Sequence, residues 1–341
     1  MYRQAPKGLL IENAVTRLQN DVNKIANASG FKVDIDTLTE IKAEVVKQKF
    51  YEVAPSSFMP VVVGEGAWAD ELLTYKSGSV SDPFESGLLA AGASGPSRDS
   101  MSETAIEALK IPVKYWKRSI SYNLVELNQA TRSGNWSLIS AKEESRFKSW
   151  QLGIQKVAFL GLEHQAVDGL LTQSDVTSNT ALITKKISEM NASEFQALLA
   201  GLFGAYNVNS DATAMPDTFV IPTDDYLGLV SSVDETYPLK SRLERLSEAG
   251  KLATMNPSFE VVPLAYAQAD KNSAFLGGGS GLNRYILYIR SDRQSLRLDI
   301  PVDYTQTITD TVSGFDYSSV AYGGFTGCKA YRPKEMLYFD Y

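Results

Sequence analysis

The chain has 341 residues, of which 44% are hydrophobic and 21% charged, and its formal net charge is −7. This length suits one large domain or two medium ones, and the composition is that of a soluble globular protein. The negative charge argues against a dedicated nucleic-acid reader, because such a domain carries a basic face that replaces phosphate counterions.

The scarcity of cysteine and histidine excludes further classes of site. The one cysteine, Cys328, excludes an internal disulfide and a cysteine-based zinc cluster, and the one histidine, His164, excludes a metal site with two histidine ligands. No run of about 18 uninterrupted apolar residues occurs, and the N-terminus lacks the layout of a secretory signal. We therefore expect no membrane segment, synthesis in a reducing cytoplasm, a buried Cys328 and a structural His164.

Two helices are predicted ahead of the first strand. Apolar residues recur every three or four positions over residues 9–26, which places them on one face of a helix. These residues include Ile11, Val15, Leu18 and Val22. A second helix is predicted from Thr37, because Thr37 and Glu40 have the spacing of a capping box. We assign residues 1–52 to a helical N-terminal arm.

Residues 66–118 contain the pattern of a long hairpin. Two strand-like segments, 71–80 and 105–120, flank a stretch rich in glycine, alanine, serine and proline. Ordering each residue of this tip costs roughly 1–2 kcal/mol of backbone entropy, more than its few apolar side chains return on burial. We therefore expect the tip to stay mobile or to become ordered against another surface.

The longest helical pattern covers about residues 134–162. Apolar side chains recur at steps of three or four, with Ser133 or Asn135 available as an N-cap. The stripe contains Trp136, Ile139, Glu143, Phe147, Trp150, Ile154 and Val157, of which only Glu143 is not apolar. We expect Ile154 and Val157 to be buried.

From about residue 190 the chain alternates between helical and strand patterns. Helices are predicted at 194–206, 225–232 and 241–249, and strands at 218–222, 259–264, 285–290 and 295–300. This alternation indicates an α/β domain with a central sheet over residues 190–300. The aromatic tail, residues 327–341, would be costly to leave loose, and we expect it to dock as a strand.

Motifs that could support catalysis favour structural interpretations. Gly64-x-Gly66-x-x-Ala69 follows a β-like run, as a dinucleotide fingerprint does, but a second strand pattern follows where that fingerprint needs a helix. The glycine run 277–281 lacks the lysine of a phosphate-binding loop, so we expect a loop tip. Glu143-Glu144 and Asp224-Asp225 are pairs of adjacent carboxylates. Adjacent side chains on a helix point about 100° apart and cannot converge on one reacting atom, so we expect these charges to be solvated.

Three segments carry a resemblance to a known family. They are Ser119-Ile-Ser-Tyr-Asn-Leu-Val-Glu-Leu127, Gly169-Leu-Leu171 and Ala330-Tyr-Arg-Pro-Lys-Glu-Met-Leu-Tyr338. With the order of the predicted parts, they make the chain resemble the major capsid proteins of tailed bacteriophages with the Hong Kong 97-like fold. The resemblance implies an α+β fold with an N-terminal arm, an extended β-hairpin loop, a peripheral domain with a long spine helix and an inserted axial α/β domain.

This resemblance implies the following domain bounds and contact residues. The arm covers 1–52, the extended loop 66–118, the axial domain 190–300, and the peripheral domain 53–65, 119–189 and 301–341, with the spine helix at about 134–162. Inter-subunit contacts are expected from Tyr75, Val80, Phe84, Leu88, Leu89, Ile111 and Tyr115 of the loop and from Ile11, Val15, Leu18 and Val22 of the arm.

The implied function is to build a shell. Copies of the chain would join as hexamers and pentamers into an icosahedral capsid around double-stranded DNA, which they would contact non-specifically. A separate scaffolding protein and a portal are the other implied partners, because only about fifty residues precede the first predicted strand, fewer than in relatives with a fused scaffold. We expect no catalysis and no cofactor, synthesis in the bacterial host cytoplasm and a final location in the virion capsid.

Two other functions stay open at this point. The first is an encapsulin-type compartment shell, which has the same fold and encloses a cargo enzyme; nucleic acid inside purified particles would separate it from a viral shell. The second is an oxidoreductase built on Gly64 and Gly66, which binding of a nicotinamide or flavin cofactor would support.

Overall fold

The computed structural model describes residues 49–80, 103–132, 138–162, 165, 167–234, 237–311 and 314–341. The helices predicted in residues 1–48, the hairpin tip and His164 lie outside the described residues. The helices are α2 (Leu124–Arg132), α3 (Leu138–Leu160), α4 (Ala192–Asn209), α5 (Thr223–Ser231), α6 (Arg242–Thr254) and α7 (Ala269–Asn272). The short 3-10 helices are η1 (Pro55–Ser57), η2 (Ile187–Glu189), η3 (Ala265–Ala267), η4 (Gly277–Gly279) and η5 (Pro333–Glu335).

The described strands form five sheets. The first strands are β1 (Val61–Val63), β2 (Glu71–Val80), β3 (Glu103–Pro112), β4 (Lys114–Asn123), β5 (Thr177–Asn179), β6 (Thr218–Pro222), β7 (Val233–Asp234) and β8 (Tyr237–Ser241). The later strands are β9 (Glu260–Leu264), β10 (Arg284–Tyr288), β11 (Leu296–Ile300), β12 (Val302–Gln306), β13 (Asp310–Thr311), β14 (Asp316–Phe325), β15 (Cys328–Ala330) and β16 (Met336–Asp340).

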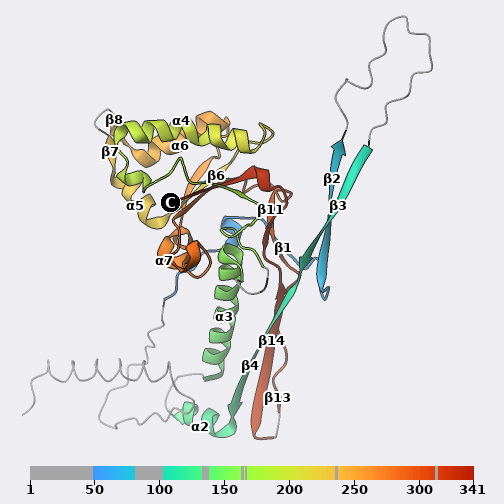
Figure 1. Ribbon diagram of the computed structural model, residues 1–341. Coiled ribbons are helices and arrows are strands. Elements are labelled where there is room, and N and C mark those ends of the chain that lie inside the picture. Colours follow the sequence, from blue (N-terminus) through green and yellow to red (C-terminus); the bar gives the residue numbers. More distant parts are fainter. Residues whose placement is uncertain are drawn as a thin grey trace, which may run out of the picture. The chain divides into compact units, whose positions relative to one another are not determined.

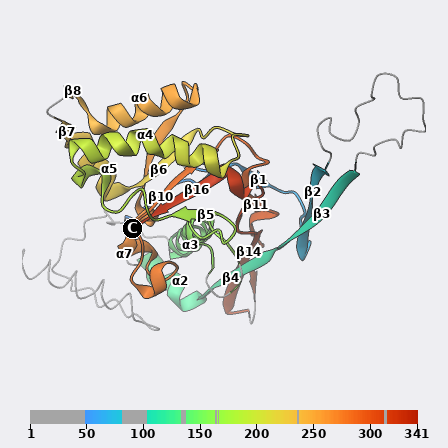
Figure 2. The ribbon, with the colours of Figure 1, turned by 45° about the horizontal axis from the view of Figure 1, so that its top comes forward.

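The largest sheet has the strand order β5-β16-β10-β6-β9 and is buried on both faces. In β6, Phe219 and Ile221 point to a core formed with α4, α5 and α6, whereas Val220 points to the core that contains α3. Figures 1 and 2 show α4 and α6 on one side of this sheet and α3 on the other. A strand buried on both faces favours apolar residues on both of them, which explains the apolar run 219–222 that follows Thr218 in β6.

The predicted secondary structure of residues 190–300 is largely confirmed, but its strands do not all share one sheet. The strand predicted at 295–300 is β11, which pairs with β1 and β15 in a separate three-stranded sheet. The tail does dock as a strand, because β16 lies between β5 and β10 in the largest sheet. The sheet that we expected within residues 190–300 therefore recruits strands from both sides of that range.

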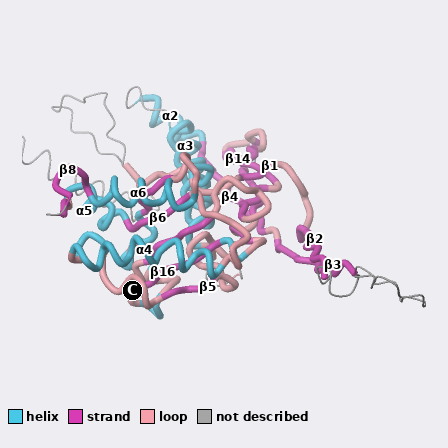
Figure 3. The backbone as a smooth tube through the Cα atoms, turned by 90° about the horizontal axis from the view of Figure 1, so that it is seen from above, coloured by secondary structure: helices cyan, strands magenta, loops and turns pink. Residues whose placement is uncertain are grey.

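The segment predicted as one strand over 105–120 is two strands, β3 and β4, with a break at Val113. The Val113 N–H donates a hydrogen bond to the carbonyl of Asp70, 2.9 Å away, which fixes the chain where it changes partners. Before the break, β3 pairs with β2 alone in a two-stranded sheet (Figure 3). After the break, β4 pairs with β14 over ten residues.

Helix α3 packs on one face of the sheet formed by β4, β14, β12 and β13. Trp150 contacts Trp116 of β4 with ring centroids 5.3 Å apart, and a Cβ on Gly323 of β14 would lie 2.4 Å from the Trp150 ring. Trp150, Ile154 and Val157 are buried, as the helical stripe predicted. The helix ends at Leu160, and Gly161 follows with a φ of +76° that favours glycine.

Candidate assembly surfaces

The hairpin of β2 and β3 exposes apolar side chains on one face. Its strands pair over their full ten-residue lengths, and side chains alternate between the two faces. Leu73 and Tyr75 of β2 and Ile106 of β3 share a face in this register. Their exposed fractions are 48%, 64% and 69%. We call these three side chains the hairpin outer face.

Contact with another surface would stabilise the hairpin outer face. A two-stranded hairpin is marginally stable by itself, because it has no third strand or helix on which to bury an apolar face. Full burial of one large apolar side chain contributes about 1.5–3 kcal/mol, so burial of all three against another surface would make the free energy of association more favourable. The surrounding strand positions carry Lys110 and Glu71, whose exposed charges form a 3.9 Å ion pair at the base of the hairpin.

The opposite face of the hairpin packs on the rest of the same chain. Leu72 lies opposite Ile111, and Ile111 is only 6% exposed. Arg297 of β11 donates a hydrogen bond to the Thr74 hydroxyl, 3.5 Å away. A cavity of about 100 Å³ lies between β3 and the segment that contains Cys328. Ile111, which we expected at an inter-subunit contact, is thus already covered within its own chain.

Two aromatic residues and two glycines lie at the base of the hairpin. Gly64 and Gly66 have φ values of +88° and +77°, and the chain then enters β2. This confirms a turn that requires glycine, and it excludes the dinucleotide fingerprint, which needs a helix at this place. Trp68, 68% exposed, stacks on Tyr115, whose hydroxyl donates a 2.9 Å hydrogen bond to the carbonyl of Ala69.

The structure separates the loop residues that we expected at inter-subunit contacts. Tyr75 belongs to the hairpin outer face, and Tyr115 lies on β4 and is 45% exposed. Val80 is the last residue of β2, and its side chain is not among those described. The remaining candidates lie outside the described residues: Phe84, Leu88, Leu89, Ile11, Val15, Leu18 and Val22.

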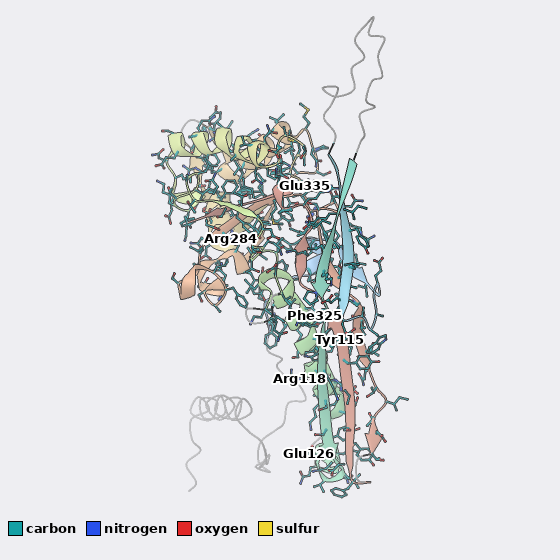
Figure 4. The ribbon with its side chains drawn as sticks, turned by 45° about the vertical axis from the view of Figure 1, so that its right-hand side comes forward. Tyr115, Arg118, Glu126, Arg284, Phe325 and Glu335 are labelled. Atoms are coloured by element: carbon teal, nitrogen blue, oxygen red, sulfur yellow. The ribbon has the colours of Figure 1, made fainter. Side chains whose placement is uncertain are left out.

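Sequence reasoning missed Leu73, Ile106 and Trp68 as exposed apolar groups. The alternation of apolar and polar residues in 71–80 predicted a strand with two different faces, but it did not show which face the chain covers. Only the register with β3 and the packing of Ile111 settle that question. Figure 4 shows Tyr115, Arg118 and Glu126 in succession from β4 into α2, beyond the hairpin.

A second group of exposed apolar side chains lies on α5 and on the hairpin of β7 and β8. Leu239 is 96% exposed, and Leu227 and Tyr237 are at least half exposed. A buried carboxylate, Asp234, holds this hairpin on α6 through ion pairs with Arg242 and Arg245. The Arg245 guanidinium also lies 4.2 Å from the centroid of the Tyr237 ring.

Asp225 is buried, so our prediction of two solvated carboxylates at Asp224-Asp225 was wrong for this residue. Its carboxylate accepts hydrogen bonds from the N–H groups of Ile187 and Ser188, at 2.9 and 2.8 Å, and from the Tyr285 hydroxyl at 2.7 Å. These three donors satisfy the hydrogen-bonding capacity of the carboxylate. Through Asp225, the segment before α4 is linked to Tyr285 in the largest sheet. Burial, followed by the nearby Asp225 charge, raises the pKa of Tyr285.

Three further observations concern the thiol of Cys328, metal binding and membrane insertion. Cys328 is fully buried, as predicted, and burial raises the pKa of its thiol, which makes it a poor nucleophile. In the part of the chain that the structure describes, no three acidic, histidine or cysteine side chains lie close enough together to bind a metal ion. None of the described helices has the length and apolar character needed to cross a bilayer.

Comparison with known proteins identifies the family. A family model described as Major capsid protein matches residues 101–341, which is more than half of the chain. The chain belongs to the major capsid protein family. This family consists of structural proteins of viral shells, so the protein is a component of a viral capsid. A search of curated proteins finds no match.

Solved structures agree with the fold of the capsid protein. The capsid of Myoviridae phage XM1 is similar with a TM-score of 0.71 and 18% identity, over 92% of this chain and 99% of that one. Mycobacterium phage Ogopogo is similar with a TM-score of 0.54 and 9% identity, over 89% and 96%. The capsid of a native GTA particle gives 0.53 and 11%, over 92% and 99%. At these identities the likeness shows the Hong Kong 97-like fold.

Proposed function

We propose that the capsid protein joins copies of itself as hexamers and pentamers into an icosahedral shell that encloses double-stranded DNA. The observation that supports this most directly is the hairpin outer face, where Leu73, Tyr75 and Ile106 are exposed on one side of a two-stranded sheet. Family membership favours a viral shell over an encapsulin-type compartment for a cargo enzyme.

In such a shell, the parts of the chain would have different roles. The hairpin within residues 66–118 acts as the extended loop, and the hairpin outer face contacts a neighbouring subunit. Helix α3 acts as the spine of the peripheral domain, and residues 190–300 provide most of the axial domain. A separate scaffolding protein and a portal take part in assembly in the bacterial host cytoplasm, and packaged DNA contacts the shell non-specifically.

The test is a double substitution on the hairpin outer face, Tyr75→Asp with Ile106→Asp. Both side chains are exposed in the single chain, so the free energy of unfolding should change little, whereas two buried charges at a subunit contact should prevent shell formation. The matched control is Tyr75→Phe with Ile106→Val, which keeps the apolar surface. Sedimentation velocity and electron microscopy measure the particles, and urea denaturation measures the fold.

The control variant should form closed particles, and the charged variant should stay as a folded, unassembled subunit. Normal particles from the charged variant would contradict the role of the hairpin outer face. DNA enclosure is measured separately, as nuclease-protected DNA in particles purified from a host that produces the phage. Particles that contain protein cargo and no DNA would favour the compartment function.

A further inference from the structure

One edge of β4 points its backbone groups away from the sheet. On the β14 side of the ladder, Val320 bonds to Thr307: the Thr307 N–H donates to the Val320 carbonyl at 2.8 Å, and the Val320 N–H donates to the Thr307 hydroxyl at 3.0 Å. Val320 therefore faces away from β4. Its ladder partner, Ser119, must point its own N–H and carbonyl away from β14. Backbone groups of residues two positions apart in a strand point to the same side, so the N–H and carbonyl groups of Tyr115 and Lys117 also point away from β14.

These outward backbone groups have no strand partner in the described part of the chain, where β4 pairs only with β14. Farther along this edge, the carbonyl of Ser121 accepts a 2.8 Å hydrogen bond from the Lys142 side chain, which confirms the direction. We call residues Tyr115, Lys117 and Ser119 the β4 edge; all three are exposed. A long unpaired edge is a template for another strand.

A groove lies beside the β4 edge, between β4 and α3. Its volume is about 280 Å³. Trp116, Trp150 and Phe325 contribute aromatic surface to it, and Lys114 and Lys156 add positive charge. Figure 4 shows Tyr115 and Phe325 close to each other on neighbouring strands, and Arg118 farther along β4. An edge strand beside a helix and an apolar groove is the arrangement that binds an added strand in β-augmentation, where pockets receive alternate side chains.

The far side of the same sheet carries complementary features. Strands β12 and β13 pair with β14 on the side opposite β4, and Ile308, in the three-residue connection between them, is 93% exposed. Asp303 and Asp310 on this side are also exposed and negatively charged, and the β4 side carries the exposed, positively charged Arg118. We call residues 303–310 the acidic edge.

We propose that the β4 edge of one capsid protein pairs with the acidic edge of a second copy, so that the sheet continues from subunit to subunit. The apolar anchor is Ile308, which enters the groove between β4 and α3 beside Trp116. This contact uses two different surfaces, one on each copy, and is therefore heterologous, the type that builds rings and lattices. The inference rests on the proposed self-assembly and names a second contact for it, besides the hairpin outer face.

The pairing makes a specific prediction about charges. Within one chain β4 and β12 both run antiparallel to β14, so copies in a similar orientation bring these strands together in parallel. Side chains two residues apart share a face of the sheet. Placing Ile308 beside Trp116 therefore places Asp310 beside Arg118. Opposite charges at such a contact favour the correct partner and register.

The first experiment compares Ser119→Pro with Ser119→Ala. Proline removes the outward N–H without removing a bond to β14, and alanine keeps this N–H. We expect Ser119→Ala to form closed particles and Ser119→Pro to remain an unassembled subunit with the far-ultraviolet spectrum of the folded protein. Because proline could still disturb the fold, Ile308→Asp serves as a second variant at an exposed position, and it should lose particles too.

The second experiment reverses the charges. Arg118→Glu and Asp310→Arg should each lose closed particles, and the double variant should recover them. For a direct readout of proximity, Arg118→Cys and Asp310→Cys subunits are mixed and oxidised. A disulfide between two different chains is expected, and the native thiol does not compete because Cys328 is fully buried.

The outcomes separate this inference from the proposed function. One outcome would overturn the edge pairing and leave shell assembly intact. In it, the Ser119→Pro and Ile308→Asp chains form particles as the wild type does, and the mixed cysteine variants form no disulfide. A wild-type chain that forms no particles with or without scaffold would overturn both. Loss of particles in the single charge variants with recovery in the double variant would support the pairing.

Discussion

Arg284 of β10 and Asp340 of β16 form a buried ion pair with two contacts. The Arg284 Nε lies 2.6 Å from Asp340 Oδ1, and its Nη2 lies 2.7 Å from Oδ2. The two residues are direct partners in the ladder, and their side chains are 10% and 6% exposed. The guanidinium also donates to the carbonyl of Leu171 and lies over the Tyr338 ring. This one side chain joins the C-terminal strand to two other segments.

Replacement of Asp340 by alanine should strongly destabilise the capsid protein. The substitution leaves the Arg284 charge buried without its partner, and such losses cost about 3–5 kcal/mol. The free energy of unfolding in urea measures the effect. As a control, Glu248→Ala removes a carboxylate that is 54% exposed and pairs with Lys240, and this change should cost at most about 1 kcal/mol. Equal losses in the two variants would contradict this reasoning.

The neighbouring residues Asp224 and Asp225 provide a second matched test. Asp225→Ala removes the acceptor of three donors, two of them buried and one half-buried, and with about 1–3 kcal/mol for each unsatisfied group we expect a loss of about 3 kcal/mol. Asp224→Ala alters an exposed carboxylate on the same turn of α5 and should change stability by less than about 0.5 kcal/mol. Thermal and urea unfolding of both variants check the difference. Similar stabilities would show that the Asp225 hydrogen bonds contribute little.

Tyrosines in and next to the largest sheet predict how stability falls at high pH. Burial raises the pKa of Tyr341 from 10.0 to about 12, and burial also raises the pKa values of Tyr285 and Tyr338. A raised pKa means that the folded state holds its proton longer than the unfolded state. The resulting stability is complete below pH 10.0 and decreases above it, between pH 10.0 and about 12 for Tyr341.

Absorbance of tyrosinate and circular dichroism, followed together during an alkaline titration, test this prediction. We expect Tyr285, Tyr338 and Tyr341 to ionise together with the loss of the folded spectrum. Complete ionisation in a protein that keeps its folded spectrum would show that the sheet tyrosines are accessible to solvent.

Local patterns were sufficient to predict most helices and strands but not the way in which strands combine. The apolar run of β6 and the stripe of α3 depend on residues close in sequence; both are confirmed, except that Phe147 of the predicted stripe is 43% exposed. The position of β11 depends on β1, more than 230 residues earlier, and no local pattern records that pairing. No strands were predicted in residues 302–325, where serine, threonine and aspartate interrupt the apolar alternation.

The candidate surfaces show the same limit. Tyr75 and Ile111 were both expected at inter-subunit contacts, yet Tyr75 is exposed and Ile111 is covered within its own chain, because strand alternation gives two faces without saying which is covered. The β4 edge depends on which backbone groups of β14 already have partners, a property of the assembled sheet. Side-chain chemistry is visible in a sequence, but the direction of a strand's hydrogen bonds is not.

The order β5-β16-β10-β6-β9 has a consequence for how the molecule folds. Residues 177–179 lie beside residues 337–339, so the sheet is complete only after a loop of more than 150 residues has closed. Such non-local topologies are slow to fold, because the entropy of closing the loop is lost before the new contacts compensate for it. Chains at an early stage of this reaction expose unpaired strand edges and apolar surface, and such partly folded chains are prone to aggregate.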